Sequence, residues 1–318
     1  MSTKKIIRGL AGLSLVATFF AGCVPKANVT YATRASAADT LARRAISNER
    51  ALKVADIPQN TIGVAPLAVL STDTTYASIG FGMASLLVAD LSQSASLTLV
   101  ERLRVDAVLR ELQLAESGRV DTVTAPRVGR LVGARQIVVG SIDMRTRNSL
   151  RVQSYVANTV TGKVGSSLNG NATLAQIFDA EKTLAFRLFD VLGVTLSPVE
   201  RRAVEQRATG SLVAFVAFSK GSRAEAFGDF GAAAANYAQA VQLDPNFTLA
   251  GQRLSVLQSP VVTASFAPLN NALFLSRATS MTTDMINRPL PVTIGTGADA
   301  AVTGRQQLVT FTVIVRTP

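Results

Sequence analysis

The feature that most constrains the fold is an alternation of strand-like and helix-like runs between Thr61 and Val191. Continuous apolar runs typical of buried strands occur at residues 62–70, 97–100 and 136–142. Apolar residues at helical spacing occur at 79–91, 105–112, 124–133 and 174–191. Because each run has an apolar face to cover, this interleaving predicts one α/β domain with helices packed on a sheet.

A β-hairpin is predicted within the same domain, which we place at residues 60–195. Residues 151–157 and 163–170 alternate in polarity around a turn-forming sequence at 158–162. Pro66 interrupts the first strand run and has no N–H to donate, so we expect a bulge or an edge there.

An export signal is predicted at residues 1–22. Lys4, Lys5 and Arg8 form a basic start, and an apolar stretch at 10–21 follows it. This charge, length and order are typical of a signal peptide, and the apolar stretch is too short to span a bilayer.

The only cysteine of the chain, Cys23, directly follows this signal. Residues 20–23 resemble the bacterial lipobox, in which the peptide is cut before the cysteine and the cysteine is then acylated. The resemblance implies that Cys23 is the lipidation site and that its acyl chains hold the protein on a membrane. Val24 stands where Asp typically signals inner-membrane retention, so the resemblance favours the outer membrane, periplasmic side.

The composition excludes much of enzyme chemistry. The chain has no histidine and one cysteine, so it has no Ser-His or Cys-His pair, no His-containing zinc site and no disulfide framework. No two carboxylates stand at a spacing that favours acid-base catalysis. We therefore expect a protein that is not an enzyme, with no catalytic residues, no metal and no cofactor.

The chain is strongly basic, with a formal net charge of +11. The arginines are spread along the sequence, there is no Trp, and no stripe combines basic and aromatic residues. We therefore expect no nucleic-acid partner and a solvated surface that tolerates anionic envelope material.

The remaining segments are less patterned. Residues 23–59 lack a strong periodicity. Residues 36–45 have the composition of a short helix, but we predict that the segment is mainly a tether. Residues 196–257 are predicted to be helical, beginning at a capping box of Ser197 and Glu200 with Pro198 between them. Two helical segments follow, divided near Gly228.

Four blocks of sequence resemble the CsgG-like family, which includes the curli-secretion lipoprotein of bacterial outer membranes. They are residues 76–94, 97–103, 112–118 and 128–141, in the family's order within residues 61–193. The resemblance implies a mixed sheet covered by helices, used for assembly and recognition without catalysis. The curli-secretion lipoprotein also has two pore hairpins, which need about 40 residues beyond the core fold. The stretch between Ile142 and Leu174 is too short for them, so we expect a domain without pore strands.

A second resemblance is to one tetratricopeptide unit, at about residues 214–247. The repeat's small, aromatic and proline positions are occupied by Gly221, Ala233, Tyr237, Ala240 and Pro245. Three other positions depart from the pattern: Ala217, Lys220 and Ala224. A single unit cannot bury its own face, so it must dock on the preceding domain, on the helix at 198–208 or on another protein.

Residues 258–318 are predicted to form a small β segment. In its last strand, one face is half apolar, and we mark it as a candidate binding edge: Leu308, Thr310, Thr312 and Ile314. The alternative is that this strand joins the chain's own sheet. The predicted fold class is thus α/β (α+β), with helices packed on a mixed β-sheet, a helical-hairpin repeat and a C-terminal β segment.

These features together predict an outer-membrane lipoprotein that faces the periplasm and acts in secretion or assembly of surface material. Its expected partners are the membrane, through the acyl chains on Cys23, and envelope or secreted proteins; a homo-oligomer stays open. The alternatives are a periplasmic adaptor that regulates a cell-wall synthase and an envelope hydrolase, against which the missing histidine argues.

Overall fold

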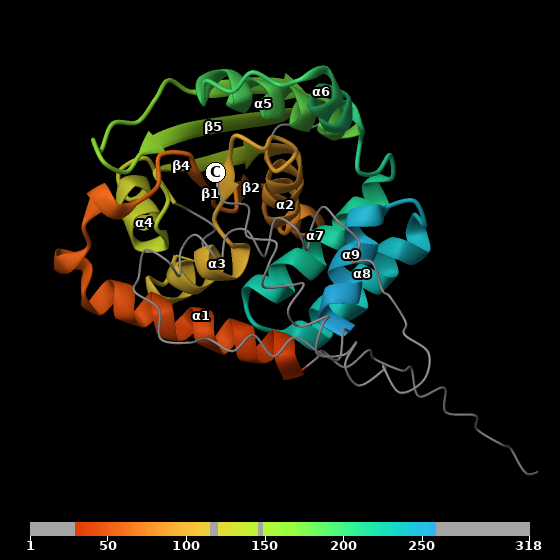
Figure 1. Cartoon of the computed structure of the whole chain (residues 1–318). Helices are drawn as coiled ribbons and strands as arrows, with labels where there is room; N and C mark the ends of the chain where they lie inside the picture. Colours follow the sequence, from red (N-terminus) through yellow and green to blue (C-terminus); the bar gives the residue numbers. More distant parts are fainter. Residues whose placement is uncertain (1–28, 115–119, 146–148, 259–318) are drawn as a thin grey trace, which may run out of the picture.

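A computed structural model describes residues 29–114, 120–145 and 149–258, and these form the predicted α/β arrangement of helices around a mixed sheet (Figure 1). The strand order is β3-β1-β4-β5-β6, and β2 pairs with β4 beyond the end of β1. The strands are β1 (Thr61–Val64), β2 (Ala68–Leu70), β3 (Thr98–Leu99), β4 (Gln136–Asp143), β5 (Leu150–Asn158) and β6 (Leu168–Ala172).

The first strand is broken where proline predicts a break. β1 and β2 both run parallel to β4, and residues 65–67 separate them. Within this break the Leu67 N–H donates to the carbonyl of Gly80, which ties the bulge to the following helix. The predicted bulge at Pro66 is therefore confirmed.

The predicted hairpin is also confirmed, and it consists of β5 and β6, which pair antiparallel. On its other side β5 pairs antiparallel with β4, with Ile137 opposite Ala157. At the turn, the side chain of Asn158 accepts hydrogen bonds from the N–H groups of Val160 and Thr161. An asparagine side chain stabilises such a turn by replacing a backbone acceptor.

The helices cover the sheet on both sides in Figure 1. In the described chain they are α1 (Val29–Ser47), α2 (Ile79–Leu91), α3 (Arg102–Glu111), α4 (Ala125–Val132), α5 (Ile177–Val191), α6 (Pro198–Glu205), α7 (Leu212–Ala226), α8 (Phe230–Leu243) and α9 (Thr248–Gln258). Four short 3-10 turns are η1 (Glu49–Ala51), η2 (Val54–Asp56), η3 (Thr74–Tyr76) and η4 (Leu174–Gln176). Helices α5 and α6 lie above the sheet in this view, α3 and α4 lie below it, and α1 runs beneath α3.

Helix α2 is the centre of the core. All of its residues except Ala89 are buried, and it packs on β1, β2, α5 and α7. Residues 74–91 are the one described helical stretch long and apolar enough to cross a membrane. A Cβ atom on Gly80 would overlap the Leu67 carbonyl, and one on Gly82 would overlap the Ser219 hydroxyl. These glycines therefore allow close packing of α2.

The structure differs from the predicted tether. Residues 29–47 form α1, which packs on α3 and has five buried apolar residues: Tyr31, Ala35, Ala38, Ala42 and Ala45. Alanine side chains let two helices approach closely, but they give a weak apolar signal in the sequence. The tether prediction over 29–59 therefore has to be corrected.

The helical region also differs, since three helices follow α6 rather than two. Helix α8 ends before Pro245, and α9 begins three residues later at Thr248. The capping box at Ser197 and Glu200 is confirmed. The predicted signal peptide, Cys23 and the β segment at 259–318, with its candidate edge, lie outside the described residues.

Candidate functional site: a buried polar junction

Four of the five predicted repeat residues lie together between α7 and α8. A Cβ atom on Gly221 would lie only 2.7 Å from Cδ1 of Tyr237, so the two helices meet at this glycine. Ala233, Tyr237 and Ala240 are fully buried at the same contact. Pro245 is exposed, in the turn after α8. The two helices therefore form a close-packed hairpin.

Local sequence signals fix the ends of this hairpin. The Ser211 side chain accepts from the Ala214 N–H at the start of α7, and Asp229 does the same for Ala232 at the start of α8. Gly228 adopts a φ of 80° between the helices, a conformation that glycine adopts without a Cβ penalty.

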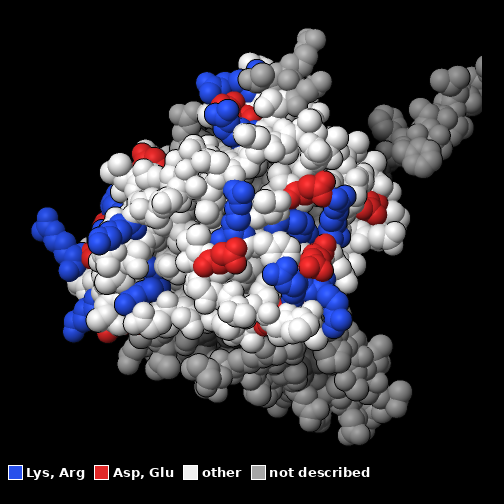
Figure 2. Space-filling view, turned by 90° about the horizontal axis from the view of Figure 1, so that it is seen from above, with Lys and Arg blue, Asp and Glu red and all other residues white. Residues whose placement is uncertain are grey.

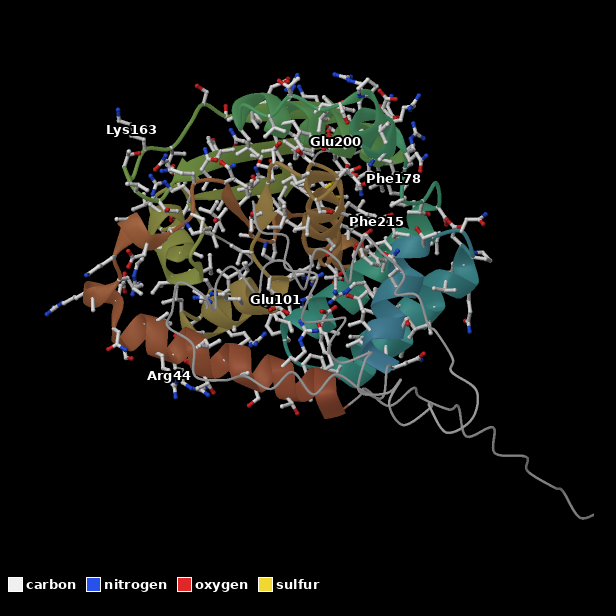
Figure 3. All side chains as sticks on the ribbon, in the orientation of Figure 1. Arg44, Glu101, Lys163, Phe178, Glu200 and Phe215 are labelled. Atoms are coloured by element: carbon white, nitrogen blue, oxygen red, sulfur yellow. The ribbon has the colours of Figure 1, made fainter. Side chains whose placement is uncertain are left out.

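The hairpin docks on the preceding domain, which decides between the three alternatives left by the sequence. Phe215 of α7 packs edge-on against Phe178 of α5, with ring centroids 5.4 Å apart (Figure 3). The hydroxyls of Ser85 on α2 and Ser222 on α7 lie 3.3 Å apart. Helix α6 packs on α2 and α5. The apolar face of the hairpin is thus covered by the chain itself.

Behind this contact lies a cluster that we call the polar junction: Tyr31, Arg102, Ser222, Glu225, Tyr237 and Arg253. Glu225 is 1% exposed and stands at its centre. Its carboxylate accepts hydrogen bonds from the hydroxyls of Tyr31 on α1 and Tyr237 on α8, and it pairs with Arg253 on α9. One carboxylate therefore holds four helices together.

Arg102 extends the polar junction to α2 and α3. Its guanidinium donates to the Ser85 hydroxyl and to the Ser222 carbonyl, and its Nε lies 3.4 Å from Asp106. Burial raises the pKa of Asp106 above its usual range, although Arg102 opposes this effect. Burial likewise raises the pKa of Tyr237 to about 12, so this phenol stays protonated and donates.

The polar junction is sealed from solvent, which limits its chemistry. Arg102, Asp106 and Arg253 are each less than a tenth exposed, and Tyr237 is fully buried. In the described part of the chain, no group of three acidic or cysteine side chains stands ready to hold a metal. What this arrangement can do is fix helices relative to one another, because a buried charge is strongly destabilising once its partner is removed.

A second buried charge cluster joins α2 to α5. Lys182 Nζ lies 2.8 Å from both carboxylate oxygens of Asp90 and 3.6 Å from Glu181. Burial raises the pKa of Asp90, and burial together with the nearby Asp90 raises the pKa of Glu181 well above its usual range. The pair is therefore a structural contact that favours a protonated carboxyl.

Sequence reasoning missed the polar junction because its members lie in separate segments. Tyr31 lies in the predicted tether and Arg253 in a helix that the pattern did not resolve. The available signal was the spacing of Tyr31, Ala35, Ala38 and Ala42, which repeats every three to four residues as on one face of a helix.

Three comparisons with known proteins bear on the family. The family described as curli production assembly/transport component CsgG matches residues 34–149. This range covers most of α1 and all of β1 to β4, so it reaches into the segment predicted as a tether. No curated protein matches the chain.

Among solved structures, the chain is similar to the following three, at low scores. The C-terminal domain of LpoB from Salmonella enterica shares 18% identity over 36% of this chain and 83% of that one, with a TM-score of 0.30. Lipoprotein GNA1162 from Neisseria meningitidis shares 14% identity over 43% of this chain and 99% of that one, with a TM-score of 0.31. LpoB from E. coli shares 15% identity over 54% of this chain and 83% of that one, with a TM-score of 0.30.

Proposed function

We propose that this chain is a lipid-anchored protein of the bacterial outer membrane that faces the periplasm and acts in secretion or assembly of surface material. The observation that carries the proposal is the match of residues 34–149 to the curli assembly and transport family. The protein works through protein contacts and is not an enzyme, in keeping with the absence of histidine.

The anchor is Cys23, and α1 begins soon after it. Residues 24–28 separate Cys23 from Val29, and a chain spans at most about 3.6 Å per residue. The domain is therefore held within roughly 20 Å of the acylated cysteine. With such an anchor, the first turn of α1, and with it the polar junction, would lie close to the membrane surface.

The anchor is tested by changing Cys23 to Ser. The variant should stay uncleaved before residue 23 or leave the membrane for the soluble periplasm, because it has no sulfur to acylate. Mass spectrometry of the intact protein and separation of membranes report both outcomes. A variant with the mass and the outer-membrane location of the unchanged protein would contradict the lipid anchor.

The α7–α8 hairpin supports the proposal that the protein acts by binding other proteins. We propose that this hairpin is a lone tetratricopeptide-like unit whose inner face serves the domain itself, as the packing of Phe215 on Phe178 of α5 supports. Any partner of this unit would then bind its outer face, where Val213 and Leu243 are 64% and 43% exposed.

A second candidate function is a periplasmic adaptor that regulates a cell-wall synthase. The observation that favours it is that β5 and β6, strands of the core sheet, lie between Ile142 and Leu174. These residues are therefore not available for the pore hairpins of the curli-secretion lipoprotein. Cross-linking in intact cells followed by capture of this protein separates the two functions. Recovery of exported surface subunits supports the first, and recovery of a wall synthase supports the second.

A further inference from the structure

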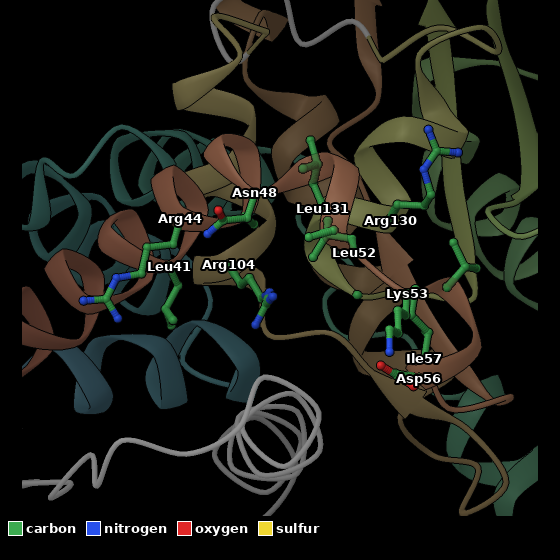
Figure 4. Close-up of a pocket in the computed structure, with 14 residues that line it drawn as sticks. Leu41, Arg44, Asn48, Leu52, Lys53, Asp56, Ile57, Arg104, Arg130 and Leu131 are labelled. Atoms are coloured by element: carbon green, nitrogen blue, oxygen red, sulfur yellow. The ribbon is translucent and has the colours of Figure 1, made fainter.

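A pocket of about 350 Å³ lies where the end of α1 and the turns η1 and η2 meet the start of α3 and the end of α4 (Figure 4). Four cationic side chains line it, each from a different segment: Arg44, Lys53, Arg104 and Arg130. Its only acidic lining residue is Asp56. The lining thus carries an excess of positive charge gathered from separate parts of the chain.

These four cations have no partners of their own among the described residues. None of their side-chain nitrogens forms a hydrogen bond or an ion pair with that part of the chain. Neighbouring arginines do have such partners, since Arg110 pairs with Asp39 and Arg127 with Glu49. The cations that face the pocket are therefore available for a ligand.

Arg104 is the central member of this set. In Figure 4 its side chain lies between α1 on one side and Lys53 and Ile57 on the other, whereas Arg44 and Arg130 extend from the rims. Burial lowers the pKa of Arg104 to about 10, and the nearby Glu101 offsets this only in part. Glu101 is itself paired with Arg34. A half-buried guanidinium without a direct partner is costly unless an anion joins it.

The acidic groups nearby do not neutralise the pocket. Glu49 acts on Arg130 through its charge, but its carboxylate already receives two hydrogen-bonding nitrogens of Arg127. Asp56 is exposed and forms no ion pair within 4 Å among the described residues. An incoming anion would therefore meet cations with little competition.

The pocket also has an apolar wall and the volume of an organic ligand. Leu41, Leu52, Ile57 and Leu131 line it beside the cations. Pockets for small organic molecules start at about 300 Å³, which is larger than a bare inorganic ion needs. The lining thus matches a body of moderate size that carries a strongly anionic group.

We propose that this pocket binds a phosphate group carried on a small organic body, with Arg104 as the principal contact and Lys53, Arg44 and Arg130 around it. Arginine presents planar, paired donors that suit phosphate oxygens, and a doubly charged phosphate monoester suits several cations better than a single carboxylate does. The phosphate could belong to a lipid headgroup or to a soluble phosphate ester. This inference does not rest on the proposed function.

Binding to the full mature chain with Cys23 changed to Ser tests the proposal with three probes, because this variant has no acyl chains that would insert into every vesicle. They are a soluble glycerol phosphate ester, vesicles of phosphatidylcholine containing phosphatidic acid, and vesicles of phosphatidylcholine alone. Binding of the soluble ester identifies a phosphate-ester site, and binding of only the phosphatidic acid vesicles identifies a headgroup site. Equal binding of both kinds of vesicle, or binding of none of the probes, overturns the proposal.

The variant Arg104→Gln should weaken binding of the phosphate probe by about tenfold or more, since a hydrogen bond between charged groups is lost. Lys53→Gln should also weaken binding of the phosphate probe. Because Lys53 is exposed, this variant keeps the test valid if Arg104→Gln folds poorly. Arg202→Gln on α6 removes the same charge outside the pocket and should leave affinity within about twofold. Equal losses in all three variants would indicate a general charge effect and overturn the site.

Discussion

The Glu225 carboxylate joins helices that lie far apart in the sequence. It receives Tyr31, Tyr237 and Arg253, so one acidic group connects α1, α7, α8 and α9. Removing one partner of such a buried pair lowers the stability of the protein, because the other charge is then left buried and unpaired.

We predict that Glu225→Leu destabilises the protein by about 3–5 kcal/mol, because Arg253 is then left buried with its charge unpaired. Replacing both residues, in Glu225→Leu with Arg253→Leu, should recover part of this loss, since no buried charge then remains uncompensated. Urea unfolding of the two single variants and the double variant measures the coupling. Strictly additive losses would show that the two residues do not act as a pair.

Glu181 predicts a pH dependence of stability. Its folded pKa is raised well above the usual 4.5 by burial and by Asp90, so the folded state holds a proton that the unfolded state releases near pH 4.5. Its contribution to stability is therefore fully present below pH 4.5 and is lost as the pH rises toward the folded pKa. The loss is about 1.4 kcal/mol per pH unit across that window.

The variant Glu181→Gln should remove this loss and be more stable than the unchanged protein at neutral pH, with the difference shrinking toward pH 4.5. Thermal unfolding at a series of pH values measures it. Asp190→Asn, an exposed position on the same helix without an ion pair among the described residues, is the matched control and should leave the pH profile unchanged. A parallel pH profile for Glu181→Gln would show that Glu181 does not titrate as described.

At the scale of single elements, the sequence predicted best where apolar periodicity was strong. Helix α2, strand β4 and the capping box that begins α6 lie where they were expected. Helix α1 was expected only as a short helix at 36–45 within a tether, because its buried face consists mainly of alanine, which contributes too little hydrophobic contrast. The third helix, α9, was merged with its neighbour because the Pro245 break fell inside the predicted repeat.

The prediction at the scale of single elements concerns the close packing of α7 on α8. Ala233 is fully buried there, so Ala233→Leu should overpack the contact and destabilise the protein by about 1–3 kcal/mol. Ala238→Leu, at a half-buried position on the same helix, should cost less than half as much. Chemical denaturation of both variants gives the comparison, and a change within about 0.5 kcal/mol at Ala233 would reject close packing of the hairpin.

At the scale of the whole molecule, the layered α/β arrangement could be predicted from the sequence. The contact that joins helices α7, α8 and α9 to the α/β domain could not. Charged surface residues follow the ordinary pattern on the face of Figure 2, where Lys and Arg are interspersed with Asp and Glu. The polar junction, in contrast, depends on residues up to 222 positions apart, such as Tyr31 and Arg253. No local pattern predicts which distant polar groups will meet once the helices are packed.

The role of residues 260–318 gives the last prediction. Among the described residues, the bonds of Glu225 and Arg102 in the polar junction lie within residues 31–253, and α9 ends at Gln258 with Leu257 buried. Deletion of residues 260–318 should therefore remove none of these bonds, and we expect the shortened protein to stay folded and lipidated. Its unfolding curve and its membrane fraction are the readouts.

The same deletion decides the role of the candidate edge at residues 308–314. If that strand is a binding edge, the shortened protein should no longer capture the partner that the full chain captures from solubilised membranes, because the pairing strand is gone. A quadruple change of Leu308, Thr310, Thr312 and Ile314 to Lys in the full chain is the finer variant, since charged side chains discourage pairing at a sheet edge. Global unfolding on deletion would instead mean that the segment is part of the core, and unchanged capture by both variants would place the partner's site elsewhere on the molecule.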